Sequence, residues 1–124
     1  MTKLKENEEL GLAELLKKLE ENFPKQIVQT ILYGSKARGD SNEDSDIDLL
    51  VILENENNQI FWDILTLASQ VSLEYDLLIN PIISNINRIE RQRGFSFYRN
   101  AARDAIQLNL RQGRLNLVPG VSLA

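Results

Sequence analysis

The chain has 124 residues, of which 43% are hydrophobic and 26% charged, as expected for one soluble globular domain. It contains neither cysteine nor histidine, which excludes disulfides, thiolate metal sites and imidazole chemistry, so a bound metal would be a hard cation on oxygen ligands. The net charge is −4, no apolar run approaches the roughly 20 residues that span a bilayer, and no secretory signal is visible, so we expect a cytoplasmic protein.

The first half of the chain predicts one helix and two strands. Leucines at helical spacing predict an amphipathic helix over residues 8–21, ended by Pro24. An apolar, β-branched run predicts a strand over residues 26–33. Residues 36–45 are polar and should form a short helical turn and a loop before a second strand over residues 46–53.

The second half predicts two helices around one strand. A helix is expected over residues 59–72, with Asn57 or Asn58 as its cap, and then a strand over residues 74–81 that Pro81 stops. A last helix is expected over residues 87–112, weakened at Gly94. Residues 1–112 are therefore predicted to form a single domain with an arginine-rich C-terminal helix, and residues 113–124 a tail that is either frayed or docked on a partner.

Charge divides the chain in two. Residues 1–83 carry 7 basic and 16 acidic side chains, a net of −9, whereas residues 84–124 carry seven arginines and two acidic residues, a net of +5. Guanidinium groups bind carboxylates and phosphates in a bidentate fork. Two interpretations stay open: a solvated face, or a surface for an acidic partner or for nucleotide phosphates.

Two short motifs carry the candidate chemistry. Gly34 and Ser35 end the first predicted strand, and such a turn offers backbone N–H groups and a hydroxyl to a phosphate. Asp46 and Asp48 lie two positions apart in the next strand, where alternate side chains point the same way. Adjacent carboxylates repel each other unless a cation lies between them, so the pair predicts a divalent metal. Each motif alone is common, but together they indicate nucleotidyl or phosphoryl transfer.

The combined spacing resembles a known signature. Gly34-Ser35, ten intervening residues and Asp46-x-Asp48 are similar to the motif of the polymerase-beta-type nucleotidyltransferase superfamily, and Gly-Ser-Lys-Ala-Arg-Gly-Asp…Ser-Asp-Ile-Asp-Leu resembles its minimal branch. The resemblance implies an α/β (α+β) polymerase-beta-like nucleotidyltransferase fold, a small mixed β-sheet with helices packed on one side. It also implies transfer of AMP from ATP to a hydroxyl, assisted by two Mg²⁺ ions or by Mn²⁺.

The remaining site residues follow from the same resemblance. It places the family's third catalytic carboxylate on Asp76, as a metal ligand beside Asp46 and Asp48 and as the general base. The alternative for Asp76 is a strand-edge aspartate paired with an arginine. The triphosphate is expected on Gly34 and Ser35, with Lys36 and Arg38 as candidates to neutralise its charge.

The resemblance also implies a partner. Members of the minimal branch are antitoxins of HEPN-domain ribonuclease toxins, so we expect a hetero-oligomer with a cognate HEPN toxin that receives AMP on a tyrosine. Binding to a membrane or directly to nucleic acid is not expected. Two alternatives stay open: a non-catalytic antitoxin that masks the toxin, and a nucleotidyltransferase acting on RNA or a small molecule.

Overall fold

The computed structural model describes residues 3–40 and 46–124. Its elements, in chain order, are α1 (Glu6–Asn22), β1 (Ile27–Tyr33), α2 (Ser35–Arg38), β2 (Ile47–Leu53), α3 (Asn58–Tyr75), β3 (Ile79–Asn85), α4 (Ile86–Gln92), α5 (Ser96–Asp104), β4 (Ile106–Arg111) and β5 (Arg114–Pro119). Within these ranges, no helix combines the length and the apolar character needed to cross a bilayer.

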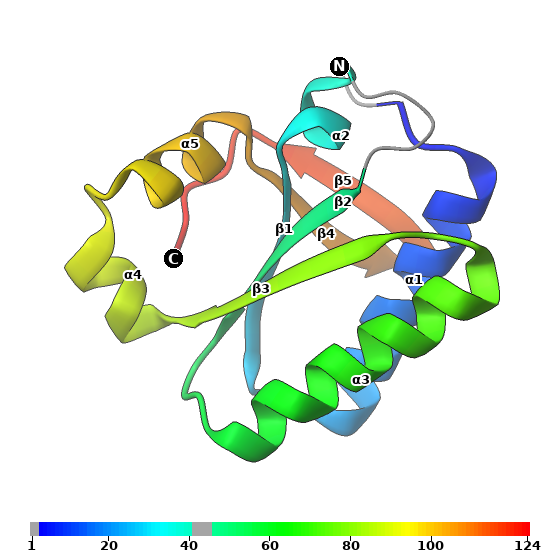
Figure 1. Ribbon diagram of the computed structural model, residues 1–124, viewed down its shortest axis with the longest axis horizontal. Helices are drawn as coiled ribbons and strands as arrows, with labels where there is room; N and C mark the ends of the chain where they lie inside the picture. The colour runs from blue at the N-terminus through cyan, green and yellow to red at the C-terminus, as the bar shows by residue number, and fades with distance from the viewer. Residues whose placement is uncertain (1–2, 41–45) are drawn as a thin grey trace.

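The sheet is mixed, as predicted, but it has five strands and not the three expected, in the order β3-β2-β1-β4-β5 (Figure 1). Strand β1 pairs antiparallel with both β2 and β4, and β4 pairs antiparallel with β5. Strands β2 and β3 are parallel, because the 18-residue helix α3 returns the chain to the same end of the sheet before β3 begins.

Helices cover both faces of the sheet (Figure 1). Helices α1 and α3 pack on the face that carries Leu32 and Leu49, in the larger core cluster. The prediction of helices on one side holds for these two long helices. The opposite face carries Ile31 and Leu50, and the shorter helices α4 and α5 pack against it. Alternation along β2 places Asp48 on this second face, in line with Leu50.

The predicted third strand is displaced along the chain. Glu74 and Tyr75 belong to α3, and Asp76 caps the C-terminus of that helix in the left-handed conformation, with φ 58° and ψ 54°. The strand itself starts at Ile79, so Pro81 lies inside β3 and does not end it. Proline is tolerated there because β3 is an edge strand, where one N–H is not needed for pairing.

The predicted last helix is wrong beyond residue 104. Gly94 does interrupt it, since it lies between α4 and α5, but the chain then forms the hairpin of β4 and β5. Gln112 and Gly113 make the turn, both with positive φ, as a tight two-residue hairpin turn requires. The expected boundary at residue 112 falls inside this hairpin.

The last residues of the chain are docked and not frayed. Leu123 is buried in the cluster on the α4–α5 face. The Gln29 side chain donates to the Ser122 carbonyl at 3.0 Å and accepts from the Ala124 N–H at 2.8 Å. The segment after β5 therefore completes the cover over this face of the sheet.

Candidate functional site

Three polar side chains form a row across neighbouring strands. Strand register pairs Asp48 of β2 with Tyr33 of β1 on one side and with Asn80 of β3 on the other. Residues in register point to the same face, and the Asn80 Nδ2 donates to Asp48 Oδ1 at 3.3 Å. Asp48 is thus held between an aromatic hydroxyl-bearing side chain and an amide.

The Gly34 turn lies directly against this carboxylate. Gly34 has φ 77° and ψ −153°, a conformation open essentially to glycine alone. A Cβ atom at this position would lie 2.8 Å from Asp48 Oδ2. Ser35 follows at the first position of α2, and its carbonyl accepts from the N–H groups of Gly39 and Asp40 at 2.9 and 3.2 Å. The two motifs predicted to act together are therefore adjacent in space.

Asp46 is exposed and lies immediately before β2. The next backbone N–H, that of Ile47, donates to the Leu78 carbonyl at 2.7 Å, which fixes the start of β2 beside the start of β3. Asp46 and Asn80 line the same open groove of about 480 Å³, with Leu73 and Leu78 among the apolar residues there. An acceptor group can thus approach the Asp46 side of the site from solvent.

Asp76 does not join Asp46 and Asp48 as predicted. Its expected place in a strand beside them is wrong, because it caps α3 and lies three positions before the first residue of β3. Across residues 3–40 and 46–124, no group of three or more Asp or Glu side chains is arranged to hold a metal ion. The residue in register with Asp48 on β3 is Asn80, an amide.

Lys36 makes a structural ion pair. Its ammonium lies 2.7 Å from Glu8 Oε2 of α1, with the two side chains only 2% and 6% exposed. The other Glu8 oxygen accepts from the Lys5 N–H at 2.8 Å and closes the capping box of α1. This burial favours a role in joining α2 to α1 over the predicted contact with the triphosphate.

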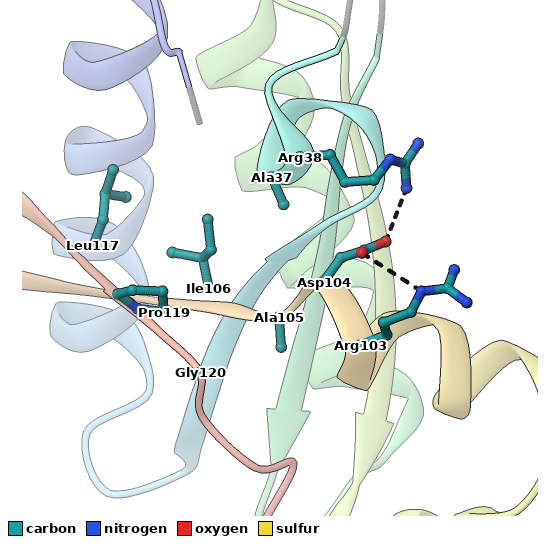
Figure 2. Close-up of a pocket in the computed structure, with 9 residues that line it drawn as sticks. All are labelled: Ala37, Arg38, Arg103, Asp104, Ala105, Ile106, Leu117, Pro119 and Gly120. Atoms are coloured by element: carbon teal, nitrogen blue, oxygen red, sulfur yellow. Dashed lines mark hydrogen bonds and ion pairs between the residues drawn. The ribbon is translucent and has the colours of Figure 1, made fainter. Parts of the chain in front are cut away.

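Arg38 is exposed but engaged by carboxylates. Its Nη1 lies 2.8 Å from Asp104 Oδ2 and its Nε 3.0 Å from Asp40 Oδ2, and these hydrogen bonds raise the pKa of the guanidinium. Figure 2 shows Arg38 and Asp104 together at a pocket of about 510 Å³, with Arg103 on the far side of Asp104. A phosphate would have to compete with Asp104 for this arginine.

The Tyr33 side chain adds no charge beside Asp48 at neutral pH. Burial, with a smaller contribution from the Asp48 carboxylate, raises the pKa of Tyr33 to about 12. Its ring meets Phe97 of α5 edge to face, with centroids 5.6 Å apart. The aromatic pair thereby connects the site to the helices on the second face.

The donor set fits Mg²⁺ that arrives with a nucleotide. Asp46 and Asp48 supply hard oxygen ligands, and proteins commonly hold Mg²⁺ through one or two carboxylates and the substrate's own phosphates. The backbone of Gly34 is close enough to Asp48 for a phosphate on the turn and a metal on the carboxylate to meet. A metal site that needs Asp76 as a third carboxylate does not fit this arrangement.

Sequence reasoning missed Asn80 and Tyr33. Each is a polar side chain near a strand end, Tyr33 as the last residue of β1 and Asn80 as the second residue of β3, which is a weak signal. Their importance depends on strand register, because each reaches the site only by pairing with Asp48. A one-residue shift in the prediction of β3 would have moved Asn80 to the opposite face.

Comparisons with known proteins identify the family of the chain. Residues 12–106 match the nucleotidyltransferase domain family. A protein of Methanocaldococcus jannaschii named "Putative protein adenylyltransferase" is 33% identical over 94 residues, which cover 76% of this chain and 90% of that protein.

Two solved structures share the fold. One is the toxin–antitoxin complex MntA–HpeT with a tyrosine-to-alanine change, at TM-score 0.53 and 24% identity, covering 89% of this chain and 76% of that one. The other is a toxin–antitoxin structure with AMP-PNP, at TM-score 0.54 and 24% identity. The match covers 80% of this chain and 73% of that one. Fold, turn and paired aspartates lead to one assignment: the chain belongs to the nucleotidyltransferase domain family.

Proposed function

We propose that this protein is an antitoxin that transfers AMP from ATP to a tyrosine hydroxyl of a cognate HEPN ribonuclease toxin. The observation that carries the proposal is the contact between the Gly34 turn and the Asp48 carboxylate. That contact brings a phosphate-binding backbone and a metal-binding side chain within a few ångströms of one another. Asp46 extends the same site toward the open groove.

The proposed reaction is a displacement at the α-phosphorus of ATP. The tyrosine oxygen forms a bond to the α-phosphorus, the bond from that phosphorus to the bridging oxygen breaks, and pyrophosphate leaves. When bound, divalent metal would neutralise charge on the attacking and leaving oxygens. Asp46 and Asp48 would hold it, while Gly34 and Ser35 orient the triphosphate.

The acceptor proton leaves toward solvent in this proposal. Asp46 is exposed on the groove, so a hydroxyl placed beside it is in contact with water. The expectation that Asp76 acts as general base is not carried forward, because it lies at the end of α3. Arg38 stays a candidate phosphate ligand, provided that the triphosphate displaces Asp104.

A protein acceptor is supported by the relative named as a protein adenylyltransferase and by the two toxin–antitoxin structures of the same fold. The sequence resemblance to the minimal branch supports a HEPN toxin in particular. The groove is consistent with a macromolecular acceptor, since it is open and partly apolar and can receive a side chain from a docked surface.

One observation favours a second function. The described residues place two carboxylates at the site, with an amide at the register position beside Asp48. A non-catalytic antitoxin that only masks its toxin would tolerate reduced metal binding, because it needs no metal for catalysis. Masking is therefore the alternative that an experiment must exclude.

Transfer of label from α-labelled ATP to a HEPN-domain protein encoded beside this chain tests the proposal. Asp48→Asn should lower Mg²⁺-dependent transfer by at least about 10²-fold, the scale expected on losing a charge-stabilising catalytic group. Asp63→Asn is the matched control, because Asp63 lies on α3 and bonds only to Gln59 in the described structure. Equal transfer by Asp48→Asn and the control would rule out this site.

A further inference from the structure

We propose that Asn80 is a positioning residue that orients Asp48 and sets an amide, in place of another carboxylate, beside it, so that metal binding depends on the nucleotide. The inference rests on the proposed function for its kinetic consequence alone. Its metal-binding consequence concerns this chain by itself and can be measured without any acceptor.

The first step is the geometry around Asp48. Asn80 Nδ2 donates to Asp48 Oδ1 at 3.3 Å, and Asp48 Oδ2 faces the Gly34 turn. Each carboxylate oxygen therefore has a separate neighbour, one an amide on β3 and the other the phosphate-binding backbone. Rotation of the carboxylate plane would break the hydrogen bond to Asn80, so the amide holds this plane with one oxygen toward the turn.

The second step is the rigidity of Asn80 itself. It is followed by Pro81, and a residue before proline is restricted to extended backbone. It is also paired in register with Asp48 along a parallel ladder that continues to the pair Leu53 and Asn85. The side chain is exposed, so its hydrogen bond is not needed to satisfy a buried polar group. A fixed, exposed amide aimed at a carboxylate is better suited to orientation than to fold stability.

The third step is charge. An aspartate in place of Asn80 would put a third carboxylate beside Asp48 and raise the attraction for a divalent cation. The amide lowers that attraction and also avoids like-charge repulsion across the β2–β3 pair. Two carboxylates then hold Mg²⁺ well only when phosphate oxygens complete its ligand set. Metal should therefore bind weakly to the protein alone and tightly with ATP.

Mn²⁺ binding to the protein without nucleotide, followed by electron paramagnetic resonance, tests the charge step. Asn80→Asp should tighten Mn²⁺ binding by at least about tenfold, because a divalent ion gains a carboxylate ligand. Asn87→Asp adds the same charge on an exposed position of α4 and should leave the affinity unchanged. Unchanged affinity in Asn80→Asp, or an equal gain in Asn87→Asp, would overturn the inference.

Kinetics test the positioning step. Asn80→Ala should lower kcat for AMP transfer by about tenfold, the scale of one hydrogen bond to a charged group, and leave the KM for ATP within about twofold. Ile82→Ala, on the same face of β3, should change neither constant. An Asn80→Ala enzyme with wild-type kcat would refute the positioning role. If no variant transfers AMP to protein while the Mn²⁺ result holds, the proposed acceptor is wrong and the role of Asn80 in metal binding stands.

Discussion

Gly34 lies against the Asp48 carboxylate, with no room for a side chain between them. The positive φ of Gly34 turns the chain from β1 into α2, and the missing Cβ leaves the Asp48 carboxylate its space. The positive φ and the lack of space both exclude a Cβ atom at Gly34. A side chain there would strain the backbone and also displace the Asp48 carboxylate. The local geometry of the site therefore depends on a single residue type.

Gly34→Ala should abolish most Mg²⁺-dependent transfer and lower the free energy of unfolding by about 1–3 kcal/mol, the cost of a strained backbone conformation. Chemical denaturation and label transfer measure the two effects. Gly94→Ala is the matched control, because its Cβ would meet nothing within 4 Å and its φ is not positive. Equal stability and transfer in Gly34→Ala and Gly94→Ala would contradict the described turn.

At the scale of single residues, the sequence could select candidate site residues where the signal was local. Gly34, Ser35, Asp46 and Asp48 could be selected from spacing, since a turn and a two-residue alternation require no tertiary information. Asn80 could not, because its place at the site depends on the register of two strands. The burial of Lys36 was also inaccessible, because its partner Glu8 is 28 positions away on another helix.

Among the elements, α2 depends on α1 for its position. This four-residue helix carries Ser35 at its start, and Lys36 ties it to α1 through the buried pair with Glu8. A buried charge whose partner has been removed is strongly destabilising. The pair thus supports the turn that carries Gly34 and Ser35.

Glu8→Gln should lower the free energy of unfolding by about 3–5 kcal/mol, because the buried Lys36 ammonium would lose the Glu8 carboxylate that lies 2.7 Å away. Chemical denaturation measures this loss. A Glu8→Leu, Lys36→Met double variant should recover much of it, since apolar side chains then replace both the buried ammonium and the buried carboxylate. If Lys36→Met instead keeps full stability and raises only the KM for ATP, Lys36 contacts the triphosphate as the sequence first suggested.

Element prediction succeeded for α1, β1, β2 and α3 and failed for β3 and the hairpin. Helix α3 continues through Leu73 to Tyr75 and ends at Asp76, which has the left-handed backbone conformation. A helix end of this kind is usually marked by glycine or asparagine, so an aspartate gave no clear signal for it. The hairpin was missed although Ile106, Leu108 and Leu110 alternate as in a strand. The residues of α5 favour a helix and are followed almost at once by β4, with no turn residue between them. The predicted helix was therefore extended past Asp104 to residue 112.

Over the whole molecule, the arginines are not one helix face. Arg99 and Arg103 are exposed on α5, on the side of the sheet that carries Asp48, whereas Arg111 and Arg114 flank the hairpin turn. Arg88 is engaged with Glu56 at 2.9 Å. A docking surface made by arginines of the C-terminal part of the chain, on the side of the sheet that carries Asp48, would therefore lie on α4 and α5. Phe95 and Phe97 are also exposed in this region.

Reversal of charge at Arg99 and Arg103 should weaken association with an acidic partner and leave Mg-ATP binding intact. Association rates should also fall with added salt, since exposed charges are screened over about 8–10 Å. Surface plasmon resonance against the HEPN-domain protein measures both effects. The same reversal at Arg111 and Arg114 is the control, and equal losses from the two pairs would indicate a general charge effect and not a surface on α5.

The central claim is that Asp46 and Asp48 catalyse transfer of AMP to a protein tyrosine. Intact-mass spectrometry of the HEPN-domain protein, co-expressed with wild-type chain or with the Asp46→Asn, Asp48→Asn double variant, tests it most directly. Both positions lie at a strand end away from the core, so the double variant should fold and still bind. We predict one or more added AMP groups on a tyrosine with wild type, none with the double variant, and rescue of growth by wild type alone. Full rescue by the double variant, with an unmodified partner in the complex, would contradict the claim and establish masking.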